Sequence, residues 1–206
     1  NDEEFQQNKL AVLAEITRLR ELCCSPQLLD NGYSGPSGKI KATMNLIKDE
    51  MADNHKILLF SQFTSALAIL KEKLANAGIK YFVIEGKTKK ADRLQFVDEF
   101  NSYDQPAVFL ISLKAGGTGL NLTSADVVIH FDPWWNIAAE NQATDRAHRI
   151  GQKNNVTIYK MIAQNTIEEK IIEMQQKKAA LANSILSGNE LANAVINKET
   201  LLNILK

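Results

Sequence analysis

Two arginines and a glutamine near the end of the chain have the residue types and spacing for phosphate chemistry. Gln142, Arg146 and Arg149 stand at i, i+4 and i+7, so a helix would carry them on one face. A guanidinium is always charged, and its planar donors match a phosphate. Asp145 stands four residues before Arg149 and could hold that side chain in one rotamer. The pattern indicates a helix that presents arginine; the alternative is an exposed basic face with ordinary ion pairs.

Such a helix also needs a face that packs against the rest of the protein. A second stripe, roughly 100° round the helix, consists of small and apolar residues that would let the backbone lie close to a packed layer. Its members are Ala139, Ala143, Ala147 and Ile150. Gly151 follows as a C-terminal cap. We therefore expect one face of the helix to be buried and the neighbouring face to direct two arginines outward.

Composition limits the function classes. With 206 residues, 45% of them hydrophobic and 23% charged, the chain is long enough for one sizeable core and a smaller appendage. The formal net charge is zero, so nucleic acid would have to bind to a local patch. No apolar run approaches the roughly 20 residues that span a bilayer. We predict a protein with no membrane partner, cytoplasmic or, in a eukaryote, nuclear. Adjacent Cys23 and Cys24 suit neither a disulfide framework nor a metal site.

Helical and strand-like segments alternate along most of the chain. Short apolar runs of the kind that form strands covered on both faces are separated by segments with helical periodicity. This order predicts an α/β fold: a RecA-like three-layer αβα domain with a mostly parallel sheet, plus flanking helices at both ends. The expected strands are 56–60, 81–85, 107–112, 126–131 and 156–162.

Two boundaries divide the chain. A loop rich in glycine, serine and proline occupies residues 30–38, and Thr166 with Glu169 forms the capping box of a long last helix that ends at Gly188. We therefore expect an N-terminal helical arm and linker, a RecA-like lobe and a C-terminal helical extension. Their ranges are 1–37, 38–165 and 166–206.

Ligands of parallel sheets gather at the carboxyl ends of the strands, and four unusual loops are expected there. They contain hydroxyl and amide groups at a helix start, a basic turn, a glycine-rich segment and two tryptophans. Each has a plain alternative: a helix cap, a solvated basic turn, a tight turn and a hydrophobic lid. Together they predict a surface for a polyanion beside the arginine pair. The loops are residues 61–64, 86–93, 112–122 and 132–136.

Three motifs resemble nucleotide-binding signatures but lack a required residue. The GKT at 86–88 follows Tyr81 where a Walker A loop needs glycine, and GGTGLNL has Leu122 where a dinucleotide fingerprint ends in glycine. Asp132 is followed by proline and tryptophan, so we predict a structural role for it. His130 is expected in the core and His148 as polar support beside the arginines.

Several segments, in order and spacing, resemble the second, C-terminal RecA-like lobe of the Swi/Snf-type ATPases, the double-stranded-DNA translocases of helicase superfamily two. The likeness runs from about Leu13 to about Leu186. ILLFSQFT resembles motif IV, VFLISLKAGGTGLNLTSADVVIHFDPWWN resembles motif V and its sequel, and QATDRAHRIGQ resembles motif VI. LRELCCSPQLL, SGKIKATMNLI and NTIEEKIIEMQQKK resemble the flanking helices. The segment EGKT departs from the usual aspartate-glycine pair.

The resemblance implies roles for particular residues. Arg146 and Arg149 would reach across a cleft to the terminal phosphate of ATP on the other lobe, with Arg149 as the arginine finger. Gln142, Gly119 and Asp145 would support the nucleotide site. The residues expected on the DNA backbone or, for the last, near the groove are Ser61, Gln62, Gly86, Thr88, Lys114, Gly117, Asn121 and Trp135.

The predicted function is therefore that of a motor lobe. ATP and Mg²⁺ would be held mainly by a first RecA-like lobe whose Walker motifs are not in these 206 residues, so we expect this chain alone to be inactive. The expected partners are double-stranded DNA, that first lobe and a protein substrate on the DNA. A strand-separating helicase and a stand-alone nucleic-acid-binding module are the alternatives.

Overall fold

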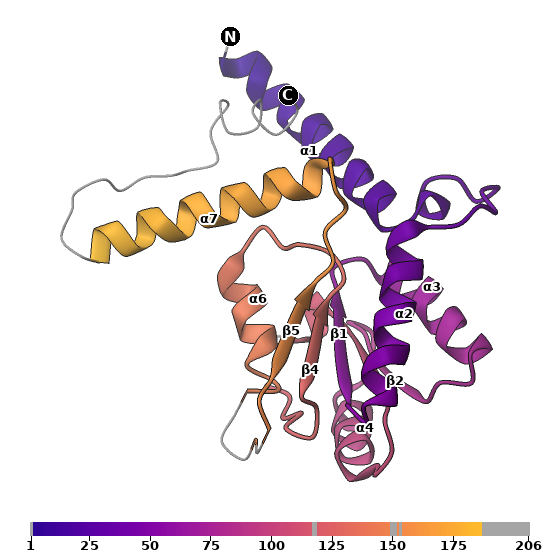
Figure 1. The fold of residues 1–206 in the computed structure, drawn as a ribbon. Helices are drawn as coiled ribbons and strands as arrows, with labels where there is room; N and C mark the ends of the chain where they lie inside the picture. The colour runs from indigo at the N-terminus through magenta and orange to yellow at the C-terminus, as the bar shows by residue number, and fades with distance from the viewer. Residues whose placement is uncertain (1, 117–118, 149–151, 153, 187–206) are drawn as a thin grey trace.

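A parallel five-stranded sheet forms the centre of the computed structural model, which describes residues 2–116, 119–148, 152 and 154–186 (Figure 1). The strands are β1 (Ile57–Ser61), β2 (Tyr81–Ile84), β3 (Val108–Ser112), β4 (Val127–His130) and β5 (Thr157–Lys160). Their order in the sheet is β2-β3-β1-β4-β5, and each neighbouring pair is parallel. The predicted parallel α/β sheet is confirmed.

The three central strands are buried along their whole length, as their continuous apolar sequences predict. In register, Leu59 of β1 lies between Leu110 of β3 and Ile129 of β4. β5 differs because it pairs only with β4, and three of its four residues are exposed. Ile158 of this edge strand is 47% exposed.

Helices cover both faces of the sheet, which gives the three layers. α2 (Gly38–Ala52) and α3 (Thr64–Asn76) pack against one face, where alternate strand residues such as Leu59 and Leu110 point. α4 (Lys90–Ser102), the short α5 (Leu113–Gly116) and α6 (Ile137–Thr144) lie on the other. The core between the sheet and α4, α5 and α6 is rich in aromatic residues, and the ring centroids of Phe100 and Phe109 lie 5.0 Å apart. The RecA-like three-layer fold is therefore confirmed.

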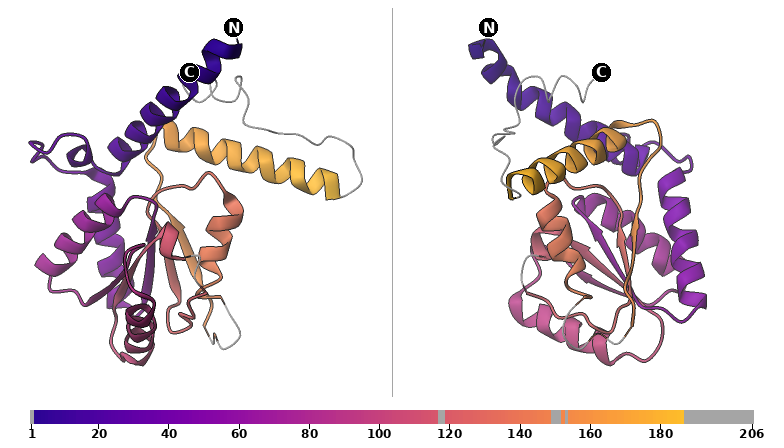
Figure 2. Two further views of the ribbon diagram at one scale, coloured as in Figure 1. Left: turned by 180° about the vertical axis from the view of Figure 1, so that it is seen from behind. Right: turned by 60° about the vertical axis from the view of Figure 1, so that its left-hand side comes forward.

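Two flanking helices lie across the carboxyl ends of the strands (Figures 1 and 2). They are α1 (Asp2–Cys24), which is followed by a short 3-10 turn at Pro26–Leu28, and α7 (Ile167–Leu186). A small apolar cluster joins them: Ile16 of α1 packs with Ile167 and Met174 of α7 and with Trp135. Within the described residues no helix is long and apolar enough to cross a bilayer.

Two details differ from the prediction. α6 ends at Thr144 rather than continuing towards Ile150, which lies outside the described residues. Thr166 does cap α7, since its hydroxyl oxygen accepts from the Glu168 backbone N-H at 3.2 Å. Of the predicted capping box with Glu169, the structure shows a backbone bond, from the Glu169 N-H to the Thr166 carbonyl at 3.2 Å, and it is the Glu168 carboxylate that turns into the protein, towards Lys39. The predicted cap at Gly188 lies outside the described residues.

Candidate functional site

The loop after β1 is bonded to the loop after β4. Ser61 is fully buried and its hydroxyl donates to the Asp132 carboxylate. The Gln62 backbone N-H donates to the same carboxylate at 3.1 Å, and the Gln62 side-chain amide donates to the Pro133 carbonyl at 3.0 Å. Gln62 is half-buried. Of the two predicted DNA contacts in this loop, Gln62 therefore reaches the surface, whereas the Ser61 hydroxyl is enclosed.

The Asp132 carboxylate holds this pair of loops together. Burial raises its pKa to about 6, because a charge is costly away from water, while the bond from Ser61 and the nearby Arg20 act in the opposite direction. The Asp132 side chain is 0% exposed and accepts from Ser61, Gln62 and Arg20, an arrangement that suits the structural role predicted for Asp132.

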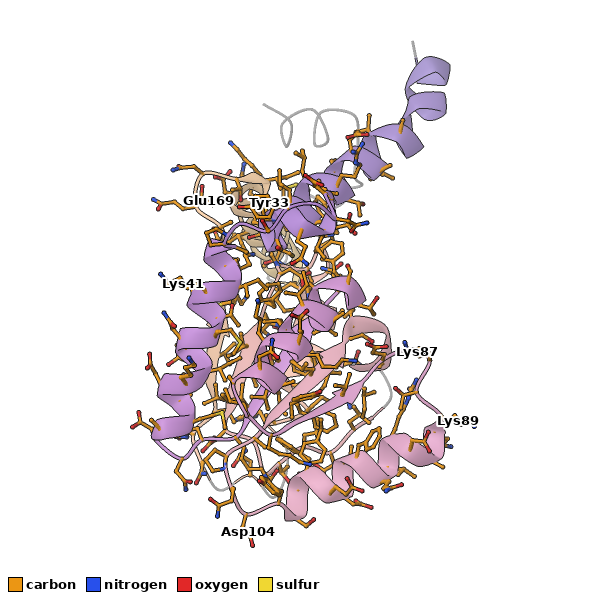
Figure 3. All side chains as sticks on the ribbon, turned by 90° about the vertical axis from the view of Figure 1, so that its right-hand side faces the viewer. Tyr33, Lys41, Lys87, Lys89, Asp104 and Glu169 are labelled. Atoms are coloured by element: carbon orange, nitrogen blue, oxygen red, sulfur yellow. The ribbon has the colours of Figure 1, made fainter. Side chains whose placement is uncertain are left out.

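The loop after β2 is a tight turn that directs charge outward. The Glu85 backbone N-H donates to the Thr88 hydroxyl oxygen at 3.0 Å, so this hydroxyl faces into the turn. Arg93 of α4 stabilises the turn by donating to the carbonyls of Thr88 at 2.8 Å and Gly86 at 3.0 Å. Gly86 is exposed, and Lys87 extends from the rim near Lys89 (Figure 3). The turn thus exposes the Gly86 backbone and Lys87 at the surface. The Thr88 hydroxyl, which was predicted to contact DNA, faces into the turn.

The loop after β3 begins with the single turn of α5. Gly119 has φ +68°, a conformation that a side chain would strain, and it is exposed. Asn121 is also exposed, and its carbonyl accepts from the Asn101 amide at 2.9 Å. Two further predicted contacts, Gly117 and the side chain of Lys114, lie outside the described part of the chain. This loop therefore presents backbone at the surface, as a phosphate chain requires.

The two tryptophans after β4 do not form a common lid. Trp134 is buried, with its ring 6.2 Å from Phe60 and 5.5 Å from His130, centroid to centroid. Trp135 is half-buried against the apolar cluster of α1 and α7. Its predicted place near a DNA groove stays a prediction, and any contact would involve the part of the ring that α1 and α7 leave open.

His130 is a core residue, as predicted. Its Nε2 lies 3.0 Å from the Thr144 hydroxyl, and its ring stacks on Phe60 at 5.7 Å. Burial lowers the pKa of His130 to about 4, so the ring is neutral at physiological pH. The histidine therefore fixes α6 to β4 and carries no charge to the site.

The arginine stripe predicted on α6 is wrong in one respect, because Arg146 does not point outward. It is only 3% exposed, whereas Gln142 and Asp145 on the same segment are exposed. After Asp145 the backbone bonds shorten by one residue: Arg146 N-H donates to Ala143 and Ala147 N-H donates to Thr144. Three-residue turns rotate the side chains relative to a regular helix, and Arg146 moves to the buried side. Arg149 lies outside the described residues.

Backbone bonding connects this turn to the glycine-rich loop. The Leu122 backbone N-H donates to the Arg146 carbonyl at 3.1 Å, and the Gln152 side-chain amide donates to the carbonyls of Ala125 and Ala147 at 2.7 and 3.2 Å. The segment that follows α6 is therefore bonded to the segment that carries Gly119 and Asn121.

Three ion pairs that the sequence pattern does not predict fasten the flanking helices and the edge strand. Lys39 pairs with Glu168 of α7 and also donates to the Met161 carbonyl at 2.9 Å; the two charged side chains are 5% and 0% exposed. Arg20 of α1 lies 3.5 Å from the Asp132 carboxylate, and Lys160 of β5 pairs with Glu140. The sequence contains only a weak indication that Arg20 is buried: it stands four residues after the buried Ile16, on the inner face of α1.

A metal site does not emerge from the described residues. No three of their acidic, histidine or cysteine side chains come close enough together to hold an ion. The Asp132 carboxylate, at the end of an apolar strand, is occupied by protein donors.

The chain is similar to known helicases. Residues 38–151 match the family model of the helicase conserved C-terminal domain. An uncharacterized ATP-dependent helicase of Mycoplasma pneumoniae is 45% identical over 175 residues, covering 85% of this chain and 17% of that protein. A putative ATP-dependent helicase/translocase of Bacillus subtilis is 38% identical over 199 residues, covering 94% and 22%. The chain thus spans about a fifth of the length of these curated relatives.

A solved structure shares both fold and sequence. The Sulfolobus solfataricus SWI2/SNF2 ATPase core in complex with dsDNA aligns with a TM-score of 0.74 at 34% identity, covering 88% of this chain and 39% of that chain. The crystal structure of the C-terminal part of the Fun30 ATPase domain aligns with a TM-score of 0.68, also at 34% identity, covering 91% and 60%.

Proposed function

Because this chain belongs to the helicase C-terminal domains of the SWI2/SNF2-family ATPases, in helicase superfamily two, we propose that it is the second motor lobe of an ATP-dependent translocase on double-stranded DNA. The observation that carries the proposal is the carboxyl edge of the sheet. Three of its loops leave residues at the surface: Gln62, which is half-buried, Gly86 with Lys87, and Asn121.

These groups suit a DNA backbone rather than base edges. Lysine and exposed backbone N-H groups bind phosphate oxygens, which are the same at every base pair. Gly86 has open space where a side chain would stand, which allows the backbone to approach a phosphate closely, while Gly119 belongs with Gln142 and Asp145 to the proposed nucleotide site. Gln62, Gly86, Lys114, Gly117 and Asn121 are therefore the proposed DNA contacts, with Ser61 acting through Asp132 and Thr88 through its turn. Such contacts let a motor follow a strand without reading its sequence.

The nucleotide side of the proposal concerns α6. Gln142 and Asp145 are exposed on one side of this helix, where a second lobe can approach, and Arg149 follows four residues after Asp145. The bound ATP and Mg²⁺ would supply the phosphoryl group and its counter-charge, held mainly by the first lobe. Arg149 would stabilise the charge that develops on the transferring phosphate, a contribution of roughly 10³ to 10⁵ in rate for an arginine finger. Arg146 is buried and would support the turn that precedes Arg149.

Translocation is tested most simply on two substrates with the intact two-lobed protein. We expect ATP-dependent displacement of a third strand from a DNA triplex, with no separation of a forked duplex. Displacement by wild type and its loss in a Gln62→Ala, Lys114→Ala double variant would support the proposal. Efficient unwinding of the fork would favour a strand-separating helicase instead, and ATP-independent binding alone would favour a stand-alone module.

A further inference from the structure

Arg20 of α1 lies at the point where the loops after β1 and β4 meet. The residue is 4% exposed although it carries a guanidinium. Its Nη2 donates to the Pro133 carbonyl at 2.9 Å and lies 3.5 Å from the Asp132 carboxylate. A charge is placed this far from water at a considerable cost, which these partners offset.

Aromatic rings from both loops complete the enclosure. The guanidinium carbon lies 5.1 Å from the ring centroid of Phe63, in the loop after β1, and 5.7 Å from that of Trp135, in the loop after β4. Both distances are within the range of cation-π attraction. One side chain of the N-terminal arm thus contacts residues in both loops.

Gln62 shares its bonding partners with Arg20. The Pro133 carbonyl accepts from the Arg20 guanidinium and also from the Gln62 side-chain amide. The Asp132 carboxylate, which faces Arg20, accepts from the Gln62 backbone N-H. Any change that moves Pro133 or Asp132 therefore moves both the backbone and the side chain of Gln62.

We propose that Arg20 is a positioning residue for DNA binding: it fixes the loop that carries Gln62, and the exposed part of Trp135, without itself contacting DNA. The inference rests on the proposed function, because Gln62 is a DNA contact only in that proposal. A guanidinium suits this task, because its donors lie in one plane and its carbon lies within cation-π range of both rings.

The test uses the intact two-lobed protein and the DNA concentration that gives half-maximal stimulation of ATPase activity. Arg20→Lys keeps the charge but loses the planar fork, so that concentration should rise about tenfold, the change expected when a well-placed charged hydrogen bond is lost. The turnover number at saturating DNA should stay within about twofold of wild type, since the change acts on binding. Arg18→Lys is the matched control: this neighbour on α1 is exposed and should behave as wild type.

A double variant separates positioning from general stability. If Arg20 acts through Gln62, adding Arg20→Lys to Gln62→Ala should weaken DNA stimulation much less than it does in wild type, because coupled residues are non-additive. An unchanged half-maximal concentration in Arg20→Lys, or full additivity in the double variant, would overturn the inference. If Gln62→Ala alone has no effect, the proposed DNA contact fails and the positioning role fails with it. An effect of Gln62→Ala without one of Arg20→Lys would refute only the positioning role.

Folding is controlled by melting temperature and by a milder variant. Phe63→Leu keeps an apolar side chain but removes the ring that lies 5.1 Å from the guanidinium carbon, and it should raise the half-maximal DNA concentration at least about threefold, because an enclosed cation-π contact is lost. If Arg20→Lys proves too unstable to assay, this variant decides the matter. No change in Phe63→Leu would then contradict the proposal.

Discussion

The carboxyl edge beneath α1 and α7 and the end of α6 are built in different ways. At the carboxyl edge, charged and polar side chains are enclosed and paired within the lobe, as with Arg20 and Asp132 or Lys39 and Glu168. At the end of α6, Gln142, Asp145 and His148 are exposed. The supporting charges of the first region therefore find their partners within the lobe, whereas the second exposes polar side chains. This difference agrees with the proposed function, in which this lobe holds the DNA-binding loops in place and another lobe completes the ATP site.

The largest expected effect is on stability, when the buried ion pair between Lys39 and Glu168 is broken. Lys39→Met should lower the free energy of unfolding by roughly 3–5 kcal/mol, because it leaves the Glu168 carboxylate buried and unpaired. Lys41→Met is the matched control, since Lys41 extends outward from the same helix (Figure 3), and it should change stability by less than about 0.5 kcal/mol. Equilibrium urea denaturation measures both. Equal stability of the two variants would show that the pair does not fasten α7.

The next effect concerns pH. The pKa of His130 is about 4 in the folded protein and 6.5 in an exposed histidine, so this residue favours folding fully above pH 6.5 and progressively less as pH falls towards 4. The His130 contribution to the free energy of unfolding that is lost over this pH range amounts to roughly 3 kcal/mol, given a pKa lowered from 6.5 to about 4. His130→Gln should therefore lose less stability than wild type between pH 7.5 and 4.5 in urea denaturation.

The comparison with wild type is needed because Asp132 changes stability in the opposite direction to His130 as the pH falls. Its raised pKa, about 6, means that protonation on the way from pH 6 to 4 favours the folded state. This contribution is common to wild type and His130→Gln and cancels in their difference. An identical pH dependence in the two proteins would contradict the neutral, buried state of His130.

The smallest effect is expected at a single DNA contact. Lys114→Ala should weaken DNA binding by roughly 1 kcal/mol on unrelated duplexes alike and reduce the salt dependence by about one released ion, since one phosphate contact is lost. Lys48→Ala, on α2 at the opposite face of the sheet, should leave affinity unchanged. Fluorescence anisotropy over a salt series provides the measurement. A loss confined to one sequence would mean base readout.

The sequence predicted those parts of the fold that local pattern determines. β1, β3 and β4 are continuous apolar runs, and burial on both faces follows directly from that composition. The carboxyl-edge loops were also found, because the end of each strand fixes their position. Arg146 was placed wrongly, since the tightening of the backbone after Asp145 leaves helical spacing in the sequence unchanged.

Contacts between distant residues could not be read from pattern. Arg20 and Asp132 are separated by 112 positions, and Lys39 and Glu168 by 129. Each charged residue taken alone has the appearance of an exposed side chain on a helix or loop. Only the packing of α1 and α7 against the sheet brings the partners together and removes them from water.

The central claim is that this lobe supplies an arginine finger to an ATP site completed by another lobe. The direct test is the DNA-stimulated turnover number of Arg149→Lys in the intact two-lobed protein at saturating ATP and DNA, with Arg18→Lys as control and melting temperature as the check on folding. The account predicts a fall of roughly 10³-fold or more with unchanged DNA affinity, because lysine keeps the charge but loses the planar fork. A near-normal turnover number would contradict it.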